Sequence, residues 1–384
     1  MEHRKNTAIL FVSTNPIWGG SEVLWSKAAL QMLESGYSVA FAVKYKSTIV
    51  ETLTKSGGMY FPLQNRKSIV KRMLVKLGWS NNVRDSFHRI VSSGKYSLIV
   101  ISQGNNVDGG YYMQACQELA QPYITVTQLV TEFLWTFLND KKINGLIGAY
   151  AGAVKNYFVS QDNLNLHIKM FGEQSSNSKV ISNPFAVDNK IIFEYPDVSD
   201  GVYHVATVAR LETYHKGYDL LLEVISSDKW KSRPIVFHFY GEGPHKELLE
   251  RLVRLYGIAN VVFEGHVQDV TRLWQSMQLM VLPSRMEGQS VALLEAMWCF
   301  RAAVVTDLGG ARELITDGEN GFIAAYPSVA ALDEALERAW EQRDSWATLG
   351  KKAGTKIRKV YSEHPVNKFC QEIESLIPYR VNKH

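Results

Sequence analysis

The sequence predicts an α/β protein built from two doubly wound domains in tandem. Its 384 residues are too many for one ordinary core and fit two domains of somewhat under roughly 200 residues each. Hydrophobic residues make up 46% of the chain and charged residues 21%, which is typical of a globular protein. Strand-sized apolar runs alternate with helix-length amphipathic stretches, and this alternation predicts parallel sheets covered by crossover helices.

The first half contains four apolar runs of strand length, with helical patterns between them. The predicted strands are AILFVS (8–13), YSVAFAV (37–43), SLIVIS (97–102) and YITVTQ (123–128). Predicted helices lie near residues 22–34, 66–77 and 109–119.

The second half repeats this organisation. Its predicted strands are HVATVAR (204–210), IVFHFYG (235–241), VVFEG (261–265), LMVLPS (279–284) and AAVVTD (302–307). Helices are expected from about residues 217, 244, 270, 289 and 311, and longer ones from 328 to 343 and beyond. The segment at 189–201 is the predicted linker between the two halves. Ligands of open α/β sheets bind at the carboxyl ends of strands, so functional residues are expected in the loops there.

Cysteine content and hydropathy indicate a cytoplasmic protein. The three cysteines, Cys116, Cys299 and Cys370, are widely separated and form no CxxC pair, which argues against a disulfide framework or a zinc site. No signal peptide and no uninterrupted apolar run of about 18 residues is recognised. The net charge of +4 is uneven, because residues 1–185 carry 19 basic and 11 acidic side chains, and the rest carry 23 and 27.

The segment VARLETYHKG (208–217) places two cations after a predicted strand. Arg210 ends the strand and Lys216 opens the next helix, so both charges are expected to converge on a helix start with free N–H groups. This arrangement indicates an anion site. The alternative is a surface Arg and Lys that happen to follow a strand.

Two glycine-rich turns also follow predicted strands. FYGEGPHKELLERL contains Gly241 and Gly243 but lacks the third glycine of a dinucleotide fingerprint. WGGSEVLW contains Gly19 and Gly20, and Ser21 is the predicted cap of the helix that follows. Glycines let backbone N–H groups approach a phosphate closely, although each turn is also explained as a plain strand-to-helix connection.

The segment PSRMEGQSVALLEAM (283–297) holds two acids, Glu287 on a predicted loop and Glu295 in a helix that begins at Gln289 and Ser290. A glutamate near such a helix start can accept hydrogen bonds from a ribose diol, and one on the loop can do so from a sugar beyond the phosphates. The alternative is that Glu295 only caps its helix or forms an ion pair within it.

Together these segments resemble glycosyltransferase family 4, a group of retaining, nucleotide-sugar-dependent enzymes with the two-domain GT-B fold. ARLETYHKG resembles the family's Arg-Leu...Lys-Gly segment, YGEGP its Gly-x-Gly-Pro turn, PSRMEGQSVALLEAM its Glu-x7-Glu signature, and TDLGGARELITDGENGF its closing block. The resemblance covers nearly the whole chain. It implies two Rossmann-like domains facing each other across a cleft: an acceptor-binding domain at 1–188, a nucleotide-sugar domain at 189–365, and a helix at 366–384 that crosses back.

The resemblance also implies roles for individual residues. Arg210 and Lys216 would bind the donor's diphosphate and neutralise its growing charge, and Glu287 would hold the donor sugar; these are the expected catalytic residues. Glu295 would hold the ribose. The remaining expected donor contacts are the amides of Gly288, Gln289, Ser290 and Val291, a base pocket near Gly241, His266 and Val267, and Gly19 and Gly20 from the first domain.

The implied chemistry is metal-independent and needs no cofactor, because cationic side chains and helix dipoles replace a metal and no DxD-like acidic cluster is present. Configuration would be retained through a short-lived oxocarbenium ion, which the acceptor attacks on the face that the diphosphate leaves. No protein nucleophile is then required, unlike in glycosidases with paired acids.

The chain departs from the family pattern in two places. Many members have a histidine where this chain has Gln128, with Glu132 nearby; glutamine cannot act as a base, so only a donor-sugar contact is assigned to it. In AMWCFRAAVV, Cys299 and Phe300 replace a small Cys-Gly turn, which we interpret as packing.

A basic amphipathic segment, NRKSIVKRMLVKLGW (65–79), is a candidate for docking on an anionic membrane that carries lipid-linked acceptors. The alternative is a core-facing helix with a solvated basic back. Peripheral contact with the inner membrane face is therefore one expected partnership, beside a nucleotide-sugar donor and a glycan or glycolipid acceptor; no nucleic-acid partner is expected.

The preferred hypothesis is a transferase of hexose-type sugars in polysaccharide or glycolipid biosynthesis. Two alternatives stay open: a nucleotide-sugar epimerase or hydrolase of the same fold, which the lack of a histidine at Gln128 disfavours, and a non-catalytic nucleotide-binding protein. The sugar, base, acceptor and linkage are not encoded in a recognisable pattern.

Overall fold

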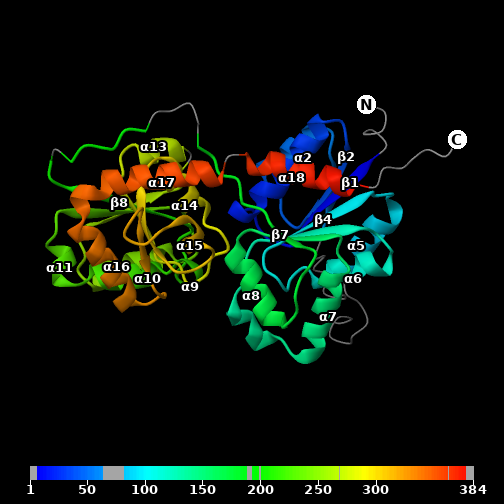
Figure 1. Cartoon of the computed structure of the whole chain (residues 1–384), viewed down its shortest axis with the longest axis horizontal. Coiled ribbons are helices and arrows are strands. Elements are labelled where there is room, and N and C mark those ends of the chain that lie inside the picture. The colour runs from blue at the N-terminus through cyan, green and yellow to red at the C-terminus, as the bar shows by residue number, and fades with distance from the viewer. Residues whose placement is uncertain are drawn as a thin grey trace. The chain divides into compact units, whose positions relative to one another are not determined.

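The computed structural model describes residues 7–63, 82–187, 193–198, 200–267, 269–361 and 363–377. The chain forms two compact units, Met1–Pro184 with Glu363–His384 and Phe185–Ser362 (Figure 1). The predicted basic helix at 65–79 lies outside the described residues, and so do residues 189–192 and 199 of the predicted linker.

The first unit is built around a seven-stranded parallel sheet with the order β3-β2-β1-β4-β5-β6-β7. Its strands are β1 (Ala8–Ser13), β2 (Ser38–Val43), β3 (Met59–Pro62), β4 (Leu98–Gln103), β5 (Tyr123–Thr127), β6 (Lys155–Phe158) and β7 (Ser178–Val180). Its helices are η1 (Gly20–Glu22), α2 (Val23–Glu34), α3 (Thr48–Lys55), α5 (Asn82–Ser93), α6 (Gly110–Glu118), η2 (Glu132–Phe137), α7 (Asp140–Ala151), α8 (Gln161–Phe171) and α18 (Pro365–Leu376).

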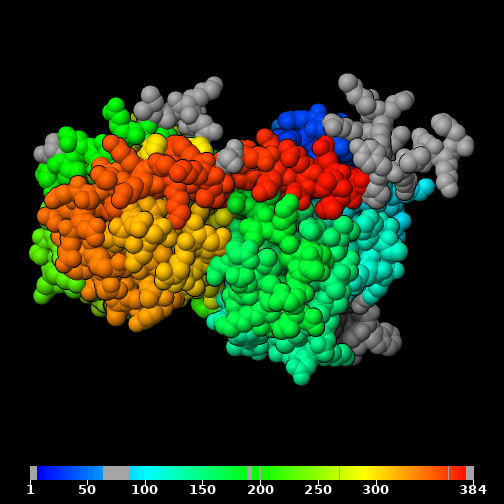
Figure 2. Space-filling view, in the orientation of Figure 1, coloured from blue at the N-terminus to red at the C-terminus, as the bar shows by residue number. Residues whose placement is uncertain are grey.

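Helices cover both faces of this sheet. In β1, Ile9 and Phe11 pack with α2, α3 and α18, whereas Leu10 and Val12 pack on the opposite face with α5, α6, α7 and α8. Alternate side chains of a strand point to opposite faces, so a strand buried on both sides needs a continuous apolar run. The last helix, α18, packs along α2, and both α8 and α18 are visible at the surface of this unit (Figure 2).

The second unit is built around a six-stranded parallel sheet with the order β10-β9-β8-β11-β12-β13. Its strands are β8 (Tyr203–Val208), β9 (Ile235–Tyr240), β10 (Val261–Gly265), β11 (Leu279–Leu282), β12 (Ala302–Thr306) and β13 (Phe322–Ala324). Its helices are α9 (Thr213–Lys216), α10 (Tyr218–Ile225), α11 (Asp228–Lys231), α12 (Lys246–Leu255), α13 (Val270–Trp274), α14 (Val291–Trp298), α15 (Ala311–Leu314), α16 (Val329–Glu341), η3 (Arg343–Ser345) and α17 (Trp346–Val360).

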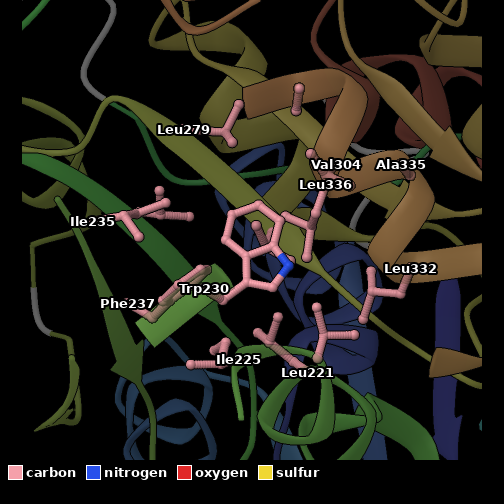
Figure 3. Packing of buried hydrophobic residues seen from close by; sticks show 14 of the residues in the cluster. Leu221, Ile225, Trp230, Ile235, Phe237, Leu279, Val304, Leu332, Ala335 and Leu336 are labelled. Atoms are coloured by element: carbon pink, nitrogen blue, oxygen red, sulfur yellow. The ribbon is translucent and has the colours of Figure 1, made fainter. Parts of the chain in front are cut away.

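Trp230 fills the centre of one core of the second unit. Figure 3 shows its indole ring surrounded by aliphatic side chains from several elements, including Leu221 of α10 and Leu336 of α16. Its Nε1 donates a hydrogen bond of 2.7 Å to Oδ1 of Asp333, so the one polar atom of this buried ring is satisfied. In α16, Leu332, Ala335, Leu336 and Ala339 recur at helical spacing and face this core.

The predicted fold class is confirmed: two parallel α/β sheets are present, and each predicted strand overlaps an observed one. The sequence patterns missed the strands β3, β6, β7 and β13. None of the helices in the described ranges is both long and apolar enough to cross a membrane.

Candidate functional site

The strand order of the second sheet sets the position of the candidate site. β8 is hydrogen-bonded to β9 on one side and to β11 on the other. The chain therefore places β9 and β10 on one side of β8 and the later strands, β11 to β13, on the other side. In open parallel sheets, ligands bind outside the carboxyl ends of the strands at such a point. The loops that follow β8 and β11 carry the predicted residues Arg210, Lys216 and Glu287.

Lys216 and Glu287 meet between these two loops. Nζ of Lys216 donates a hydrogen bond of 2.6 Å to Oε1 of Glu287, and the hydroxyl of Ser284 donates to the same oxygen at 2.8 Å. The side chains are largely buried, with exposed fractions of 23% for Lys216 and 11% for Glu287. Lys216 was expected to open a helix, but it is the last residue of the one-turn helix α9.

Arg210 is paired with a different carboxylate in the same loop. Its Nη2 donates a hydrogen bond of 2.5 Å to Oε2 of Glu212, and Oε1 of Glu212 lies 2.7 Å from Nδ1 of His215. Burial acts to raise the pKa of Glu212, but the contacts with His215 and Arg210 outweigh it and lower the pKa. Glu212 is therefore ionised at neutral pH. The sequence patterns did not single it out.

Arg285 joins the two loops. It forms a two-armed ion pair with Asp219 of α10, with N–O distances of 2.6 and 2.7 Å, and donates a further bond to the carbonyl of Thr213. The backbone N–H groups of Arg285 and Met286 donate to the carbonyl oxygen of His215. These bonds hold the loop carrying Lys216 against the loop carrying Glu287. Sequence inspection missed Arg285, because its partners lie more than sixty residues earlier in the chain.

Gly217 allows the close contact between these loops. It adopts a left-handed conformation, with φ of +64°, between α9 and α10. A Cβ atom at this position would lie 1.9 Å from the carbonyl oxygen of Pro283, which is shorter than any tolerated contact. Only glycine fits both the backbone angle and the space.

The predicted glycine turn after β9 lies against the loop after β8. Gly241 has a φ of +135°, and a Cβ atom there would lie 2.1 Å from the carbonyl oxygen of Ala209. A Cβ on Gly243 would lie 2.3 Å from the carbonyl oxygen of Leu211. These two glycines therefore let the backbone of the turn after β9 contact the backbone of the loop that carries Arg210, and this contact supports that loop.

The loop and helix after β11 carry the other predicted donor contacts. Gly288 and Gln289 precede the helix, Ser290 is its N-cap and accepts a hydrogen bond from the N–H of Leu293, and α14 begins at Val291. The predicted helix start is therefore one or two residues early. Glu295 lies within α14, is 6% exposed, and accepts a bond of 3.3 Å from the N–H of Ala186.

His266 and Val267, the predicted base pocket, follow β10. The side chain of Val267 packs against the apolar cluster of β11, α13 and α14, whereas His266 is exposed. The N–H of Gly241 donates to the carbonyl of Gly265, so the turn after β9 and the turn after β10 are neighbours.

The predicted contacts in the first unit lie at the carboxyl ends of β1 and β5. Gly19 precedes η1 and Gly20 begins it, and within the described ranges no atom lies within 4 Å of a Cβ placed on Gly19. The prediction of Ser21 as a helix cap is wrong: Glu22 is the N-cap of α2, and its carboxylate is fully buried, accepting bonds from the side chains of Asn15, Trp25 and Tyr45.

Gln128 is buried at the end of β5. Its Oε1 accepts a hydrogen bond of 2.9 Å from Nδ2 of Asn183, and its Nε2 has no hydrogen-bond partner in the part of the chain that the structure describes. The predicted contact of Gln128 with the donor sugar stays a prediction, because this amide nitrogen is itself buried.

The arrangement in the second unit is suited to binding an anion. Both predicted cations are matched by carboxylates, Arg210 by Glu212 and Lys216 by Glu287. Only one nitrogen of Arg210 is engaged with Glu212, and an ammonium group has three donors, so both side chains keep N–H groups for a further acceptor. Their carboxylate partners fix where the charges stand before any ligand binds.

Comparisons with known proteins agree on family and fold. Residues 203–342 match the family model described as glycosyl transferases group 1. The chain is 31% identical over 150 residues to the putative glycosyltransferase EpsD of Bacillus subtilis, and these residues are 39% of each chain. It is 27% identical over 153 residues to a poly(ribitol-phosphate) alpha-N-acetylglucosaminyltransferase of Staphylococcus aureus, covering 39% of this chain and 31% of that relative. The chain thus matches well under half the length of these two relatives.

Solved structures share the fold over almost the full length. The Anabaena protein Alr3699/HepE, crystallised in complex with UDP-glucose, aligns with a TM-score of 0.75 at 17% identity and covers 96% of this chain and all of its own. The Staphylococcus aureus protein TarM, in a complex with UDP, Fondaparinux and alpha-GlcNAc-glycerol, aligns with a TM-score of 0.72 at 13% identity. At such identities the likeness concerns the fold, which is the GT-B arrangement of two parallel α/β sheets.

Proposed function

We propose that this chain, which belongs to the glycosyl transferases group 1 family, transfers a hexose-type sugar from a nucleoside-diphosphate sugar to a glycan or lipid-linked acceptor. The observation that carries the proposal is the pairing of Lys216 with Glu287 beside Arg210, on two loops at the point where the strand order reverses. A site for a nucleotide sugar needs a cationic part for the diphosphate and a carboxylate for sugar hydroxyls, and these residues supply both.

In the proposed reaction, Arg210 and Lys216 bind the diphosphate and stabilise the charge that develops on it as the glycosidic bond breaks. Glu287 accepts hydrogen bonds from donor-sugar hydroxyls and exchanges part of its contact with Lys216 and Ser284 for them. Glu295, from the adjoining helix, holds the ribose. Charge neutralisation by these side chains would need no metal ion.

The sugar would keep its anomeric configuration. The acceptor hydroxyl attacks the face that the diphosphate leaves, its oxygen forms the new bond to the anomeric carbon, and its proton passes to the departing diphosphate. This route uses no protein nucleophile, so Glu287 aligns the donor and forms no covalent bond. Relatives described as transferases for polysaccharides and for an undecaprenol-linked sugar support a glycan or lipid-linked acceptor.

A panel of nucleotides and nucleotide sugars tests the proposal. A ligand that binds only the folded chain raises its melting temperature, so UDP-, GDP- and ADP-sugars should separate into binders and non-binders by thermal shift. The best binder is then incubated with candidate acceptors, and sugar transfer is followed by mass spectrometry. Consumption of the donor without any acceptor would favour an epimerase or hydrolase instead, and binding without turnover a nucleotide-binding protein.

We also propose that the basic segment at 65–79 contacts anionic membranes. Its structure lies outside the described residues, so the support is the sequence pattern alone. Sedimentation with vesicles that contain an anionic phospholipid should show binding, and Lys71→Glu with Lys76→Glu should weaken it while nucleotide-sugar binding, measured by thermal shift, is unchanged. If the parent chain does not bind such vesicles, the proposed membrane contact is wrong.

A further inference from the structure

We propose that His215, oriented by Glu212, is a third ligand of the donor's diphosphate and carries a proton while the diphosphate is bound. The inference rests on the proposed function, because it concerns the same site. His215 lies between Arg210 and Lys216 in the loop after β8, and its side chain is one third exposed, so a ligand can reach it. The proposed binding of the diphosphate by Arg210 and Lys216 does not involve the imidazole of His215.

The contacts of the His215 ring determine which nitrogen a ligand can use. Glu212 is ionised and can only accept, so its Oε1, 2.7 Å from Nδ1, holds the proton of His215 on Nδ1. The other nitrogen, Nε2, lies on the far side of the ring from this bond. Without a second proton Nε2 presents a lone pair, which repels an anion; with one, it is a cationic donor.

The same carboxylate also places His215 beside the other diphosphate ligand. Oε2 of Glu212 holds Nη2 of Arg210 at 2.5 Å, so the guanidinium and the imidazole are separated by the width of one carboxyl group. The backbone of His215 is fixed as well, since its carbonyl accepts two N–H groups from the loop after β11. Glu212 is therefore a positioning residue for both side chains.

The charges around His215 favour the protonated ring once a diphosphate arrives. Glu212 lies at Nδ1, the ring of Tyr214 is edge-on with a centroid separation of 5.1 Å, and the nearby cations Lys216 and Arg285 are paired with Glu287 and Asp219. An anion at Nε2 would place negative charge on both sides of the imidazole, which stabilises the imidazolium. One proton passes from solvent to Nε2 on binding, and no other bond changes.

Calorimetry of nucleotide-sugar binding in two buffers tests this proton uptake. The ligand is UDP-glucose, or the nucleotide sugar with the largest thermal shift, because a diphosphate esterified at both ends does not itself titrate near neutral pH. Two buffers of different ionisation enthalpy at one pH should give different apparent heats for the parent chain, which reports proton uptake. His215→Gln should abolish the difference and weaken binding roughly tenfold, the effect of losing one charge-assisted hydrogen bond.

Two further variants separate positioning from general damage. Glu212→Gln leaves His215 in place and still offers an oxygen that accepts a hydrogen bond from Nδ1, but it removes the negative charge of residue 212. Proton uptake on binding should therefore fall even though the imidazole is present. His88→Gln, the same change in the first unit where the ring contacts Glu118, should match the parent in affinity and heats. Melting temperatures of all variants are measured, and His215→Asn serves as a second variant if His215→Gln is unstable.

The outcomes distinguish this inference from the proposed function. If Lys216→Ala weakens nucleotide-sugar binding but the His215 variants leave both affinity and proton uptake unchanged, His215 is not a ligand and only the inference is overturned. If Lys216→Ala also has no effect, or if no nucleotide sugar binds, the proposed site itself is wrong and the inference falls with it.

Discussion

Lys216 and Glu287 are joined by a hydrogen bond of 2.6 Å although 71 residues separate them in the chain. The bond spans the loops after β8 and β11, which are neighbours because those two strands are hydrogen-bonded in the sheet. It sets an ammonium group and a carboxylate at fixed positions before a ligand binds, and such preorganised charge is the main means by which enzymes stabilise a developing charge.

Lys216→Ala is expected to lower the turnover number by at least about a hundredfold, the effect of removing one preorganised charge partner. Steady-state kinetics with the identified donor and acceptor measure it. Lys246→Ala is the matched control, because Nζ of Lys246 lies at the outer limit of an ion pair, 4.0 Å from Glu250, and half of its side chain is exposed. Equal rates for the two variants would remove Lys216 from the mechanism.

Gly217→Ala is expected to destabilise the second unit and to weaken donor binding. The added Cβ would lie 1.9 Å from the carbonyl of Pro283, so the loops after β8 and β11 must separate. A loss of more than about 2 kcal/mol in the free energy of unfolding is expected, combining backbone strain with overpacking. Urea unfolding measures it.

Gly257→Ala provides the comparison for that change. Gly257 has a similar φ of +59°, but no atom of the described residues lies within 4 Å of the added Cβ. Only the left-handed backbone then opposes the substitution, at a cost of roughly 1–2 kcal/mol, and donor affinity should be unaffected. If both variants lost the same free energy of unfolding and bound the donor equally well, the contact of residue 217 with Pro283 would not contribute to the effect of Gly217→Ala.

Arg301→Met should destabilise the second unit by about 1–3 kcal/mol, the cost of leaving buried acceptors unsatisfied. Arg301 is fully buried and donates hydrogen bonds to backbone carbonyl oxygens at the ends of several elements: Glu194, Trp274, Met277, Cys299 and Phe300. Methionine fills similar volume but leaves these buried acceptors unsatisfied. Differential scanning calorimetry measures the shift, and Arg251→Met, at an exposed site on α12, should stay within about 0.5 kcal/mol of the parent.

His167→Phe should make the first unit less sensitive to acid. Burial among Tyr150, Phe158 and Phe171 lowers the pKa of His167 to about 3. Below the ordinary pKa of histidine, about 6.5, this histidine binds a proton in the unfolded chain but not in the folded chain. The free energy of unfolding therefore decreases as the pH falls.

For this one group, the loss between pH 7 and pH 5 is about 2 kcal/mol. Urea unfolding of the parent and of His167→Phe at both pH values isolates it, because all other titrating groups are common to the two chains. An identical pH dependence would mean that His167 is protonated in the folded state.

The predictions from sequence were most successful where apolar runs are long. Strands such as AILFVS and SLIVIS are buried on both faces, so every residue must be apolar or small and the run is visible. The missed strand β7, SKV, has three residues, none fully buried, and β13 has only FIA before a polar turn. Such short edge strands depend on a neighbour for their hydrogen bonds, which no local pattern records.

The site divides in the same way. Arg210, Lys216, Glu287 and Glu295 could be named from the spacing of motifs, because residue type and local order within one loop or helix are properties of the chain itself. The partners of these residues could not. The importance of Glu212 depends on its contacts with two side chains, Arg210 and His215, one at each oxygen. The importance of Arg285 depends on its ion pair with Asp219, 66 residues away in the chain.

The sequence alone therefore determined the two α/β units, the positions of their main strands along the chain and which loops carry charged side chains, since periodic burial and turn chemistry act over a few residues. The tertiary structure decided which charges meet. That choice depends on β8 lying beside β11, on backbone contacts at Gly217 and Gly241 that are too close for a side chain, and on the burial that makes an unpaired charge costly.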